Sequence, residues 1–436
     1  MRNIDGSLEP VLSLLRGRGL LDEAREPLDR VYQAAAEIAR RDGLRALLFR
    51  VRGYPWRLAA NLIVSRQLLY QLLGVESDRE AYTLLEQAAS NPGRLERGDF
   101  NSWYTPVKGG LEVLPALRFY EDDGGLYVTS AVFIACLEDA CNASIHRIMV
   151  ADDASYAAVR VVPRHLYSML QRSPEGLPVA VAIGVDPRIL LAAASSPPYG
   201  FFELGLAASL LGGSLSVCET PRYRLPVPCG ASMVVEAVLG PERAPEGPFT
   251  DLLQLYDERR EEPVLKIDAV YVNKRREPIM HVILPGGVEH MLLMGFPREA
   301  SVYNAVSRSV PRVRKVRLTP GGGMWLHAVV SIEKLHDGDG KTAGFAALAA
   351  HPSVKHVVVV DDDIDPDNPR EVEWAIATRL QADRGLVVVP HARGSTLDPS
   401  AREGLTTKII VDATAPLGER KRYRRPRIPG AGRVER

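Results

Sequence analysis

The chain has 436 residues, of which 46% are hydrophobic and 25% are charged, and its formal net charge is zero. This composition is typical of a soluble globular protein, and the length predicts two or three domains. A neutral chain has no overall field to attract nucleic acid or an acidic membrane. No apolar run reaches the roughly 18 residues of a membrane-spanning helix. Because the N-terminus lacks the apolar core of a signal peptide, the sequence predicts a cytoplasmic protein.

The cysteines and amides give two smaller indications. The four cysteines form no CxxC pair, so we expect reduced thiols within the core: Cys136, Cys141, Cys218 and Cys229. Asn and Gln together number only 15, and this scarcity of heat-labile amides favours a thermophilic source.

Residues 1–100 are predicted to form a largely helical α/β region. The segment LDRVYQAAAEIARR places four apolar residues on one helical stripe: Leu28, Val31, Ala35 and Ile38. The segment SDREAYTLLEQAAS begins with Ser77 and Glu80 at capping-box spacing. The turn-rich stretch 91–99, NPGRLERGD, predicts a boundary.

Residues 101–300 change to short runs rich in β-branched side chains. LYVTSAVFI, AAVRVV, PVAVAI, MVVEAVL and IMHVIL are punctuated by Gly and Pro, and one helix is predicted at FFELGLAASLLGG. Several short strands with little helix between them predict a barrel or a mixed sheet.

Residues 301–436 alternate between strands and helices. LHAVVSI, HVVVV and GLVVV are predicted strands, and TAGFAALAA and NPREVEWAIATRL are predicted helices, the second capped by Asn368. This rhythm predicts a buried parallel sheet, so the fold class of the whole chain is α/β with α+β character. The basic tail 418–430 is expected to be solvated or to pack against a subunit, because it is short and follows a strand.

Two segments imitate ligand-binding motifs. DDDIDPDNPREV spaces Asp361, Asp363 and Asp365 like a calcium loop, but Pro366 and Val372 occupy the positions that need Gly and Glu. GDGKT ends like a phosphate-binding loop, but Leu335 replaces its first glycine. We therefore expect neither an EF-hand nor a nucleotide hydrolase.

Four other segments carry candidate chemistry: CNASIHRIMV, PRHLYSML, SSPPYGFFELG and PEGPFTD. They contain an amide, an imidazole and a carboxylate at Asn142, His165 and Glu203, while Glu246 and Asp251 lie five residues apart in the last segment. Each residue alone has an ordinary explanation as a turn, cap or surface group. Their combination along one chain favours a site.

In this order the segments resemble the UbiD family of reversible, non-oxidative decarboxylases. NASIHR matches the family pattern N-x-S-I-x-R, and His165 follows the arginine by 18 residues. Glu203, the APEGPFTD segment and the block VVVVDDDIDPDNPREVEWAIATRLQADRG with TKIIVDAT come after it. The resemblance covers Leu111 to Asp412. It implies a split β-barrel flavin-binding domain over 101–300, between the N-terminal region 1–100 and a C-terminal α/β domain over 301–436.

The resemblance also implies prenylated FMN with a divalent metal, Mn²⁺ or Mg²⁺, held by Asn142, His165 and Glu203. A mixed nitrogen and oxygen ligand set suits these metals. Family positions that bind the cofactor or its potassium ion correspond here to Asn142, Ser144, Ile145, Arg147, Arg164, His165, Ala194, Ser195 and Glu203.

Arg147, Glu246 and Asp251 correspond to the catalytic network of the family. Arg147 is expected to grip a substrate carboxylate and to pair with Glu246, which should keep Glu246 ionised. An apolar pocket should raise the pKa of Asp251, so that Asp251 carries the proton. His146, where relatives have Ala or Tyr, is expected to reshape the pocket.

The compact length resembles the archaeal branch of the family, whose expected substrate is trans-anhydromevalonate 5-phosphate and whose product is isopentenyl phosphate. Lys274, Arg275 and Arg298 are candidates for binding the substrate phosphate. The resemblance implies a flavin prenyltransferase that supplies the cofactor, and a homo-oligomer based on dimers. The alternatives are an aromatic or polyprenyl hydroxybenzoate decarboxylase and a non-catalytic flavin-binding assembly factor.

Overall fold

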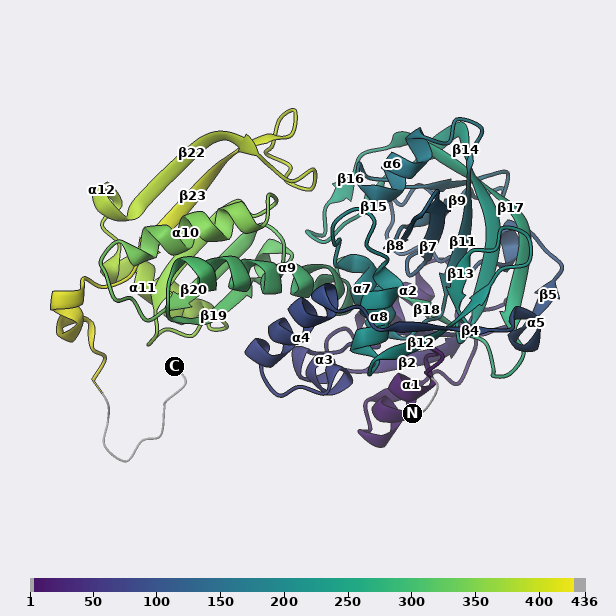
Figure 1. Cartoon of the computed structure of the whole chain (residues 1–436), viewed down its shortest axis with the longest axis horizontal. Helices are drawn as coiled ribbons and strands as arrows, with labels where there is room; N and C mark the ends of the chain where they lie inside the picture. Colours follow the sequence, from purple (N-terminus) through teal and green to yellow (C-terminus); the bar gives the residue numbers. More distant parts are fainter. Residues whose placement is uncertain (1–3, 427–436) are drawn as a thin grey trace. The chain divides into compact units, whose positions relative to one another are not determined.

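The computed structural model describes residues 4–426 and divides the chain into two compact units, Met1–Pro297 and Arg298–Arg436. Figure 1 labels the helices and strands of both units. Within the described residues, no helix is long and apolar enough to cross a bilayer. The mixture of helices with an antiparallel half-barrel and a separate α/β sheet confirms the predicted fold class.

The N-terminal part of the first unit contains a sheet as well as helices. Its helices are α1 (Glu9–Gly17), α2 (Gln33–Ala39), α3 (Arg66–Leu73) and α4 (Asp78–Ser90). The sheet has the order β1-β2-β3-β18, with bounds Leu21–Glu23, Ala46–Arg50, Arg57–Ala60 and Ile279–Val282. The predicted cap of α4 is confirmed, since the Ser77 side chain accepts from the Glu80 N–H.

The expectation of a largely helical N-terminal region is wrong in two places. The helix predicted from Leu28 begins only at Gln33, because Tyr32 adopts a positive φ of 64° that no helix accommodates. The buried run Ala46–Arg50 forms β2, although it is too short to show a clear period.

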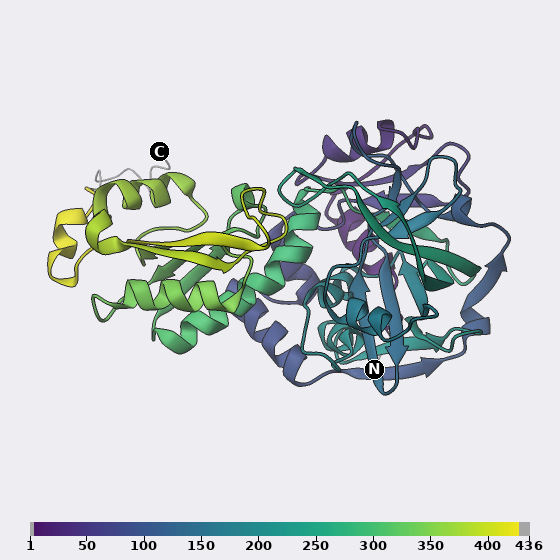
Figure 2. The ribbon, with the colours of Figure 1, turned by 90° about the horizontal axis from the view of Figure 1, so that it is seen from above.

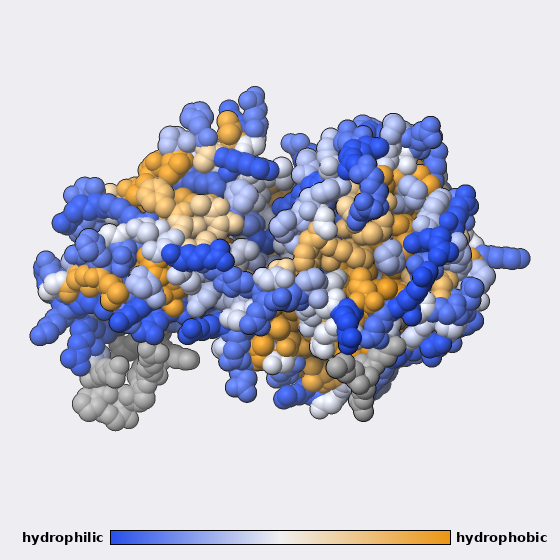
Figure 3. Space-filling view, in the orientation of Figure 1, coloured by the Kyte–Doolittle hydropathy of each residue, from blue (hydrophilic) through white to orange (hydrophobic). Residues whose placement is uncertain are grey.

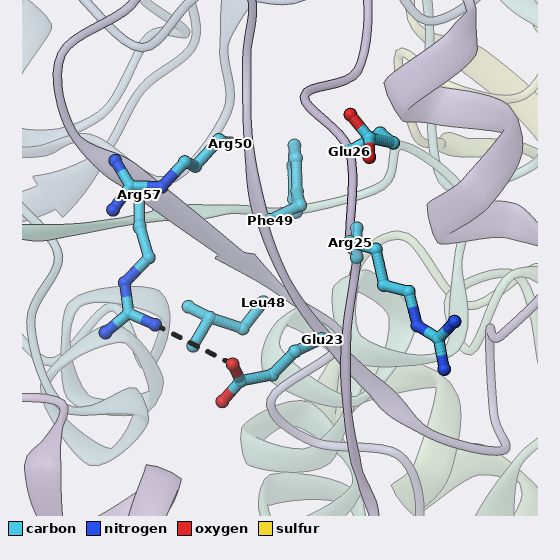
Figure 4. Close-up of a pocket in the computed structure, with 8 residues that line it drawn as sticks. Glu23, Arg25, Glu26, Leu48, Phe49, Arg50 and Arg57 are labelled. Carbon is cyan, nitrogen blue, oxygen red and sulfur yellow. Dashed lines mark ion pairs between the residues drawn. The ribbon is translucent and has the colours of Figure 1, made fainter.

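A recess of about 250 Å³ lies on this small sheet (Figure 4). It is lined by Glu23, Ala24, Arg25, Glu26, Leu48, Phe49, Arg50 and Arg57. Arg57 lies 4.0 Å from Glu23 across it. None of the candidate residues from the sequence lines this recess, so it is separate from the site described below.

A nine-stranded antiparallel sheet forms the core of the first unit. Its order is β6-β9-β10-β17-β14-β11-β7-β8, with β5 beside β17. The bounds are Leu126–Val128, Ile148–Val150, Ala157–Val159, Arg260–Asn273, Met233–Glu246, Leu177–Ile183, Val132–Leu137, Ala140–Ile145 and, for β5, Tyr104–Val107. Alternate residues of these strands, such as Phe133, Val181 and Val235, face one continuous core.

The connection between β8 and β9 shows that this sheet curls into a barrel. β8 is the last strand of the order and β9 is the second, yet only His146 and Arg147 separate them in the chain. Two residues span at most about 7 Å, so opposite ends of the sheet must meet there. Arg147 therefore lies at the seam of the barrel.

The remaining elements of the first unit cover this barrel. They are α5 (Phe100–Trp103), η1 (Leu111–Val113), α6 (His165–Gln171), α7 (Pro187–Ala194) and α8 (Glu203–Leu210), with a sheet of order β13-β12-β4 (Pro226–Pro228, Ser214–Glu219, Arg94–Gly98). The short strands β15 (Phe249–Thr250) and β16 (Tyr256–Asp257) form a hairpin. The predicted helix at FFELGLAASLLGG is α8, which lies beside α7 and β8.

The second unit is an α/β sheet of order β19-β20-β21-β23-β22, and Figure 2 shows helices on both of its faces. The strands span Val313–Leu318, His327–Ile332, His356–Asp361, Leu405–Ala413 and Leu386–Arg393. The helices are the last part of α9 (Val288–Ser309), η2 (Pro320–Gly322), α10 (Asp339–Ala350), α11 (Pro369–Arg379), α12 (Ala382–Gly385) and η3 (Leu417–Tyr423). β20, β21 and β23 are parallel, as expected for this sheet. The predicted strand GLVVV is β22, and its placement in a buried parallel sheet is wrong, because it is an edge strand that pairs antiparallel to β23 and is largely exposed.

The acidic segment after β21 is neutralised by arginine. Arg379 binds Asp361 through Nη1 at 2.6 Å and Asp363 through Nη2 at 2.7 Å. Arg420 of the basic tail lies 3.4 Å from Asp361, so the described part of the tail packs on this unit. The carboxylates that imitate a calcium loop are thus bound to cations of the protein, and the rest of the tail, 427–430, lies outside the described residues.

The expectation of reduced cysteines is wrong, because the four thiols form two disulfides. Cys136 pairs with Cys141, which lies directly opposite it across the β7–β8 hairpin. Cys218 of β12 pairs with Cys229, which follows β13. A CxxC motif is not needed, since hairpin register brings distant cysteines into contact.

Replacing both cysteines of one disulfide with serine is expected to lower the free energy of unfolding by about 2–3 kcal/mol. Each disulfide closes a short loop in the unfolded chain and so lowers the entropy of the unfolded state, and the substitution removes this constraint. Urea unfolding with and without reductant measures the loss. Thiol titration of denatured protein prepared without reductant should find no free thiol. Four titratable thiols would contradict the pairing.

Candidate active site

The predicted ligand residues meet where β8 lies beside α6 and α8. Asn142 is on β8, His165 is the first residue of α6, and Glu203 is the first residue of α8. Asn142 Nδ2 donates to Glu203 Oε1 at 2.9 Å, and the Ala143 N–H donates to Glu203 Oε2 at 2.7 Å. His165 Nδ1 lies 4.0 Å from Glu203 Oε1. The structure therefore brings all three residues together.

The environment of these groups fits a divalent cation. Glu203 is 2% exposed, and burial raises its pKa to about 7, although the backbone N–H groups of Ala143 and Glu203 and the Asn142 amide favour its charged form. Burial, and then the nearby Arg164 charge, lower the pKa of His165, which favours the neutral imidazole that metals bind. A gap of 4.0 Å is about twice an Mg²⁺–ligand distance. Within residues 4–426 no cluster of three His, Cys, Asp or Glu side chains could hold a metal, so a cation here would also need the Asn142 amide.

The other candidate cofactor residues surround this group. Ser144 and Ile145 continue β8, and Ser144 Oγ donates to Asn142 Oδ1 at 2.9 Å. Arg164 precedes α6 and donates to Ser196 Oγ at 2.8 Å. Ala194 ends α7, and Ser195 caps it while its hydroxyl donates to the Leu191 carbonyl. The α7 end and the α6 start thus flank one region, and the role of Ala194 and Ser195 in binding potassium stays a prediction.

Arg147 is bound by two carboxylates at the barrel seam. Its Nε and Nη2 atoms donate to the two oxygens of Glu246 at 2.7 and 2.8 Å, and Nη2 also donates to Asp257 at 3.2 Å. Glu246 is fully buried at the end of β14. The guanidinium lies 5.0 Å from the centre of the Phe249 ring. The bidentate edge of Arg147 is therefore occupied by Glu246, and Nη1 has no hydrogen-bond acceptor within residues 4–426.

Asp251 lies in the loop that joins β15 to β16 and is 8% exposed. Burial raises its pKa to about 6, which is the direction that the sequence predicted. The N–H groups of Leu253 and Leu255 oppose this rise, and the Asp257 charge adds to it. Asp251 is therefore able to hold a proton near neutral pH, next to a carboxylate that Arg147 binds.

Glycine is required where the acid loop meets the rest of the barrel. A Cβ atom on Gly124 would lie 2.2 Å from the Gly247 carbonyl oxygen. The Gly124 N–H donates to the Pro248 carbonyl at 2.9 Å, and Gly286 packs in the same way against the Asp251 carbonyl. Two backbone segments thus hold the loop between Glu246 and Asp251.

His146 lies between the residues around Asn142 on β8 and Arg147 at the barrel seam. It is 7% exposed; its Nδ1–H donates to the Arg160 carbonyl at 2.9 Å, and its Nε2 lies 2.9 Å from Ser144 Oγ. Burial lowers its pKa to about 4, so it is neutral. In the structure Nδ1 is bound to the protein and Nε2 faces the Ser144 hydroxyl, and the expected effect of His146 on the pocket stays a prediction.

Sequence reasoning missed Arg160 and Asp257. Asp257 lies in the charged run YDERREE, which reads as a solvated surface, and its position opposite Phe249 depends on hairpin register. Of the phosphate candidates, Arg275 lies far along its strand from the site, and the role of Arg298 stays a prediction. Arg275 lies just after the end of β17 and donates to the Ser102 carbonyl. Arg260, at the other end of this strand, is about 40 Å away along the strand. Arg298 belongs to the second unit, where it lies over Trp325.

Three family domains match the chain. They are the N-terminal, Rift-related and C-terminal domains of 3-octaprenyl-4-hydroxybenzoate carboxy-lyase, over residues 12–88, 101–288 and 291–413. Similar curated proteins include the anhydromevalonate phosphate decarboxylases of Aeropyrum pernix and Methanothermobacter thermautotrophicus. The first is 51% identical and covers 92% of both chains, and the second is 46% identical over 78% of this chain and 81% of the relative.

Solved structures agree with this assignment. The UbiD-class enzyme HmfF from Pelotomaculum thermopropionicum in complex with FMN is 37% identical with a TM-score of 0.92, covering 97% of this chain and 98% of the other. An evolved dimeric form of that enzyme in complex with prFMN is 34% identical with a TM-score of 0.88, covering 98% and 97%. The chain therefore belongs to the UbiD family of carboxy-lyases and is a decarboxylase.

Proposed function

We propose that the protein decarboxylates trans-anhydromevalonate 5-phosphate to isopentenyl phosphate with prenylated FMN as its cofactor. The observation that carries the substrate is the likeness to relatives named anhydromevalonate phosphate decarboxylase, at up to 51% identity over 92% of the chain. The likeness to enzymes that bind FMN and prFMN supports the cofactor.

The protein groups would act as follows. Arg147 binds the substrate carboxylate through Nη1, while Glu246 fixes the opposite edge of the guanidinium. Prenylated FMN, when bound, supplies the sink for the electron pair of the breaking carbon–carbon bond. The carboxylate leaves as carbon dioxide, and Asp251 gives its proton to the carbon that lost it. Asp251 then recovers a proton from solvent, so the net change is substrate plus one proton to product plus carbon dioxide.

Asn142, His165 and Glu203 would hold Mn²⁺ or Mg²⁺ beside the cofactor phosphate. Ala194 and Ser195 would hold K⁺ at the end of α7, and Ser144, Ile145 and Arg164 would contact the cofactor. The metal would offset the phosphate charge and the charge of the buried Glu203 carboxylate, whose pKa burial raises to about 7. A separate flavin prenyltransferase would supply the cofactor.

A homo-oligomer is part of the same proposal. Large apolar side chains are exposed on the second unit, with exposed fractions of 55% for Val388 and 50% for Phe345. Figure 3 shows apolar surface gathered over the region of β22 and α10. The existence of an evolved dimeric form of a structural neighbour supports assembly through subunit contacts.

The function is tested by co-expression with a flavin prenyltransferase and purification with Mn²⁺. We expect a visible cofactor spectrum and carbon dioxide release from anhydromevalonate phosphate, with no turnover of hydroxybenzoates. Turnover of aromatic acids alone would establish a hydroxybenzoate decarboxylase instead. A protein that binds flavin but releases no carbon dioxide from either class would indicate an assembly factor.

A further inference from the structure

Asp257 is a partly buried carboxylate of the site, and the proposed reaction leaves it without a role. It lies on β16, where it is the register partner of Phe249 on β15. The Phe249 ring lies under the Arg147 guanidinium and stacks on Tyr127 at 3.7 Å. The hairpin therefore presents Asp257 to Arg147 from the strand next to the ring that supports it.

Three arginines surround the Asp257 carboxylate, whose side chain is 9% exposed. Arg260 Nη1 lies 2.5 Å from Oδ1, and Oδ2 lies 3.2 Å from Arg147 Nη2 and 3.6 Å from Arg160 Nε. Burial opposes ionisation, but the three guanidinium groups outweigh it and hold the pKa of Asp257 below its ordinary value. Asp257 is thus a charged centre between three cations.

The effect of Asp257 on Arg147 follows from which of the five guanidinium N–H groups have acceptors. Glu246 accepts from Nε and from Nη2, and Asp257 accepts from Nη2. Among the described residues, Nη1 has no hydrogen-bond acceptor. We propose that Asp257 is a positioning residue, which holds Nη2 so that Arg147 presents its Nη1 edge to the substrate carboxylate. This inference rests on the proposed function.

A second consequence concerns Asp251, which lies in the same β15–β16 hairpin as Asp257: the Asp251 N–H donates to the Leu255 carbonyl at 3.0 Å, two residues before Asp257. Asp257 raises the pKa of Asp251, and Arg147 lowers it. The loop 285–287, which packs against Asp251, contains only Pro and Gly. His290, which follows this loop in α9, is neutral in the relevant range because burial and then the Arg147 charge lower its pKa to about 4. Removing the Asp257 charge should therefore lower the pKa of Asp251.

The positioning role is tested with Asp257→Ala in the enzyme loaded with prenylated FMN. We expect KM to rise roughly ten- to a hundredfold with a smaller change in kcat, which is the size of a lost charge-assisted contact. Asp257→Asn, which keeps an acceptor, should restore most of the affinity. Glu262→Gln is the matched control, since Glu262 binds Arg160 Nη1 at 2.5 Å in the same cluster but has no contact with Arg147 among the described residues. It should leave KM within twofold.

The charge role is tested in protein without cofactor. Infrared difference spectra against Asp251→Asn report the titration of the Asp251 carboxyl group. We expect a midpoint near pH 6 in the unaltered protein. In Asp257→Asn the midpoint should be lower by roughly half a pH unit or more, and in Glu262→Gln it should be unchanged.

A merely structural Asp257 would lower thermal stability and cofactor content without moving KM or the Asp251 midpoint, and this result would overturn the inference. An equal rise of KM in Glu262→Gln would overturn it as well. The proposed function fails separately, when the unaltered loaded protein releases no carbon dioxide. The infrared titration still decides the charge role in that case, because it needs neither cofactor nor substrate.

Discussion

Asp251→Asn is expected to abolish decarboxylation while the protein still binds its cofactor. The amide cannot deliver a proton, and a general acid contributes roughly a hundredfold or more to the rate. In the unaltered enzyme kcat/KM should fall as the pH rises through about 6, where Asp251 loses its proton. The visible spectrum of the cofactor and the rate of carbon dioxide release measure the two properties side by side.

The same substitution should make the protein without cofactor more stable at high pH. Burial raises the pKa of Asp251 from 3.8 to about 6, so its contribution to stability is complete below pH 4 and is lost as the pH rises through 6. Asn never ionises. The free energy of unfolding of Asp251→Asn should therefore exceed that of the unaltered protein by about 1–3 kcal/mol at pH 8, after discount for solvent screening, and match it at pH 4.

Asp251→Glu is the control, because it restores an acid one methylene further along. We expect it to retain turnover. Full activity in Asp251→Asn, or a stability difference of the opposite sign at pH 8, would show that Asp251 is not the buried proton donor.

Glu203→Gln is expected to remove divalent-metal binding and with it the retention of flavin phosphate. The substitution keeps the shape of the side chain but removes the one anionic oxygen pair between Asn142 and His165. We expect the affinity for Mn²⁺ to fall by roughly a hundredfold or more. Titration calorimetry of metal-free protein with Mn²⁺, followed by flavin absorbance after gel filtration, measures both losses.

Glu236→Gln is the matched control for this variant. Glu236 is also fully buried and accepts backbone N–H groups, from Arg222 and Tyr223, but it lies near the start of β14, between β11 and β17. It should lose stability and keep its Mn²⁺ isotherm. Normal metal binding in Glu203→Gln would remove Glu203 from the ligand set.

The sequence could predict which site residues lie close together when they belong to one short segment. Asn142 and the residues after it lie on one strand, and Glu246 and Asp251 lie five residues apart in one segment, so spacing along the chain already brings them near each other. Their meeting with His165 and Glu203 was expected from family resemblance, and the structure brings these side chains into contact. Their roles as ligands stay predictions.

Features that depend on pairing between strands were beyond the sequence. Cys136 and Cys141 face each other only because β7 and β8 pair in that register, and a shift by one residue would turn them apart. Asp257 reaches Arg147 for the same reason, through its pairing with Phe249. The strand β2 was missed because a short buried run has no period that distinguishes it from a helix.

The hairpin from Glu246 to Asp257 has a consequence for engineering. One continuous segment carries the carboxylate that binds Arg147, the proposed proton donor and the proposed positioning residue, whereas the proposed metal ligands come from β8, α6 and α8. Exchange of this segment between relatives would thus transfer the residues proposed for protonation together and leave the proposed metal ligands unchanged. In chimeras joined at Pro245 and Arg260, where the strands β14 and β17 pair, the pKa of the acid should follow the parent that supplies the segment. The cofactor affinity should follow the parent that supplies the rest of the chain.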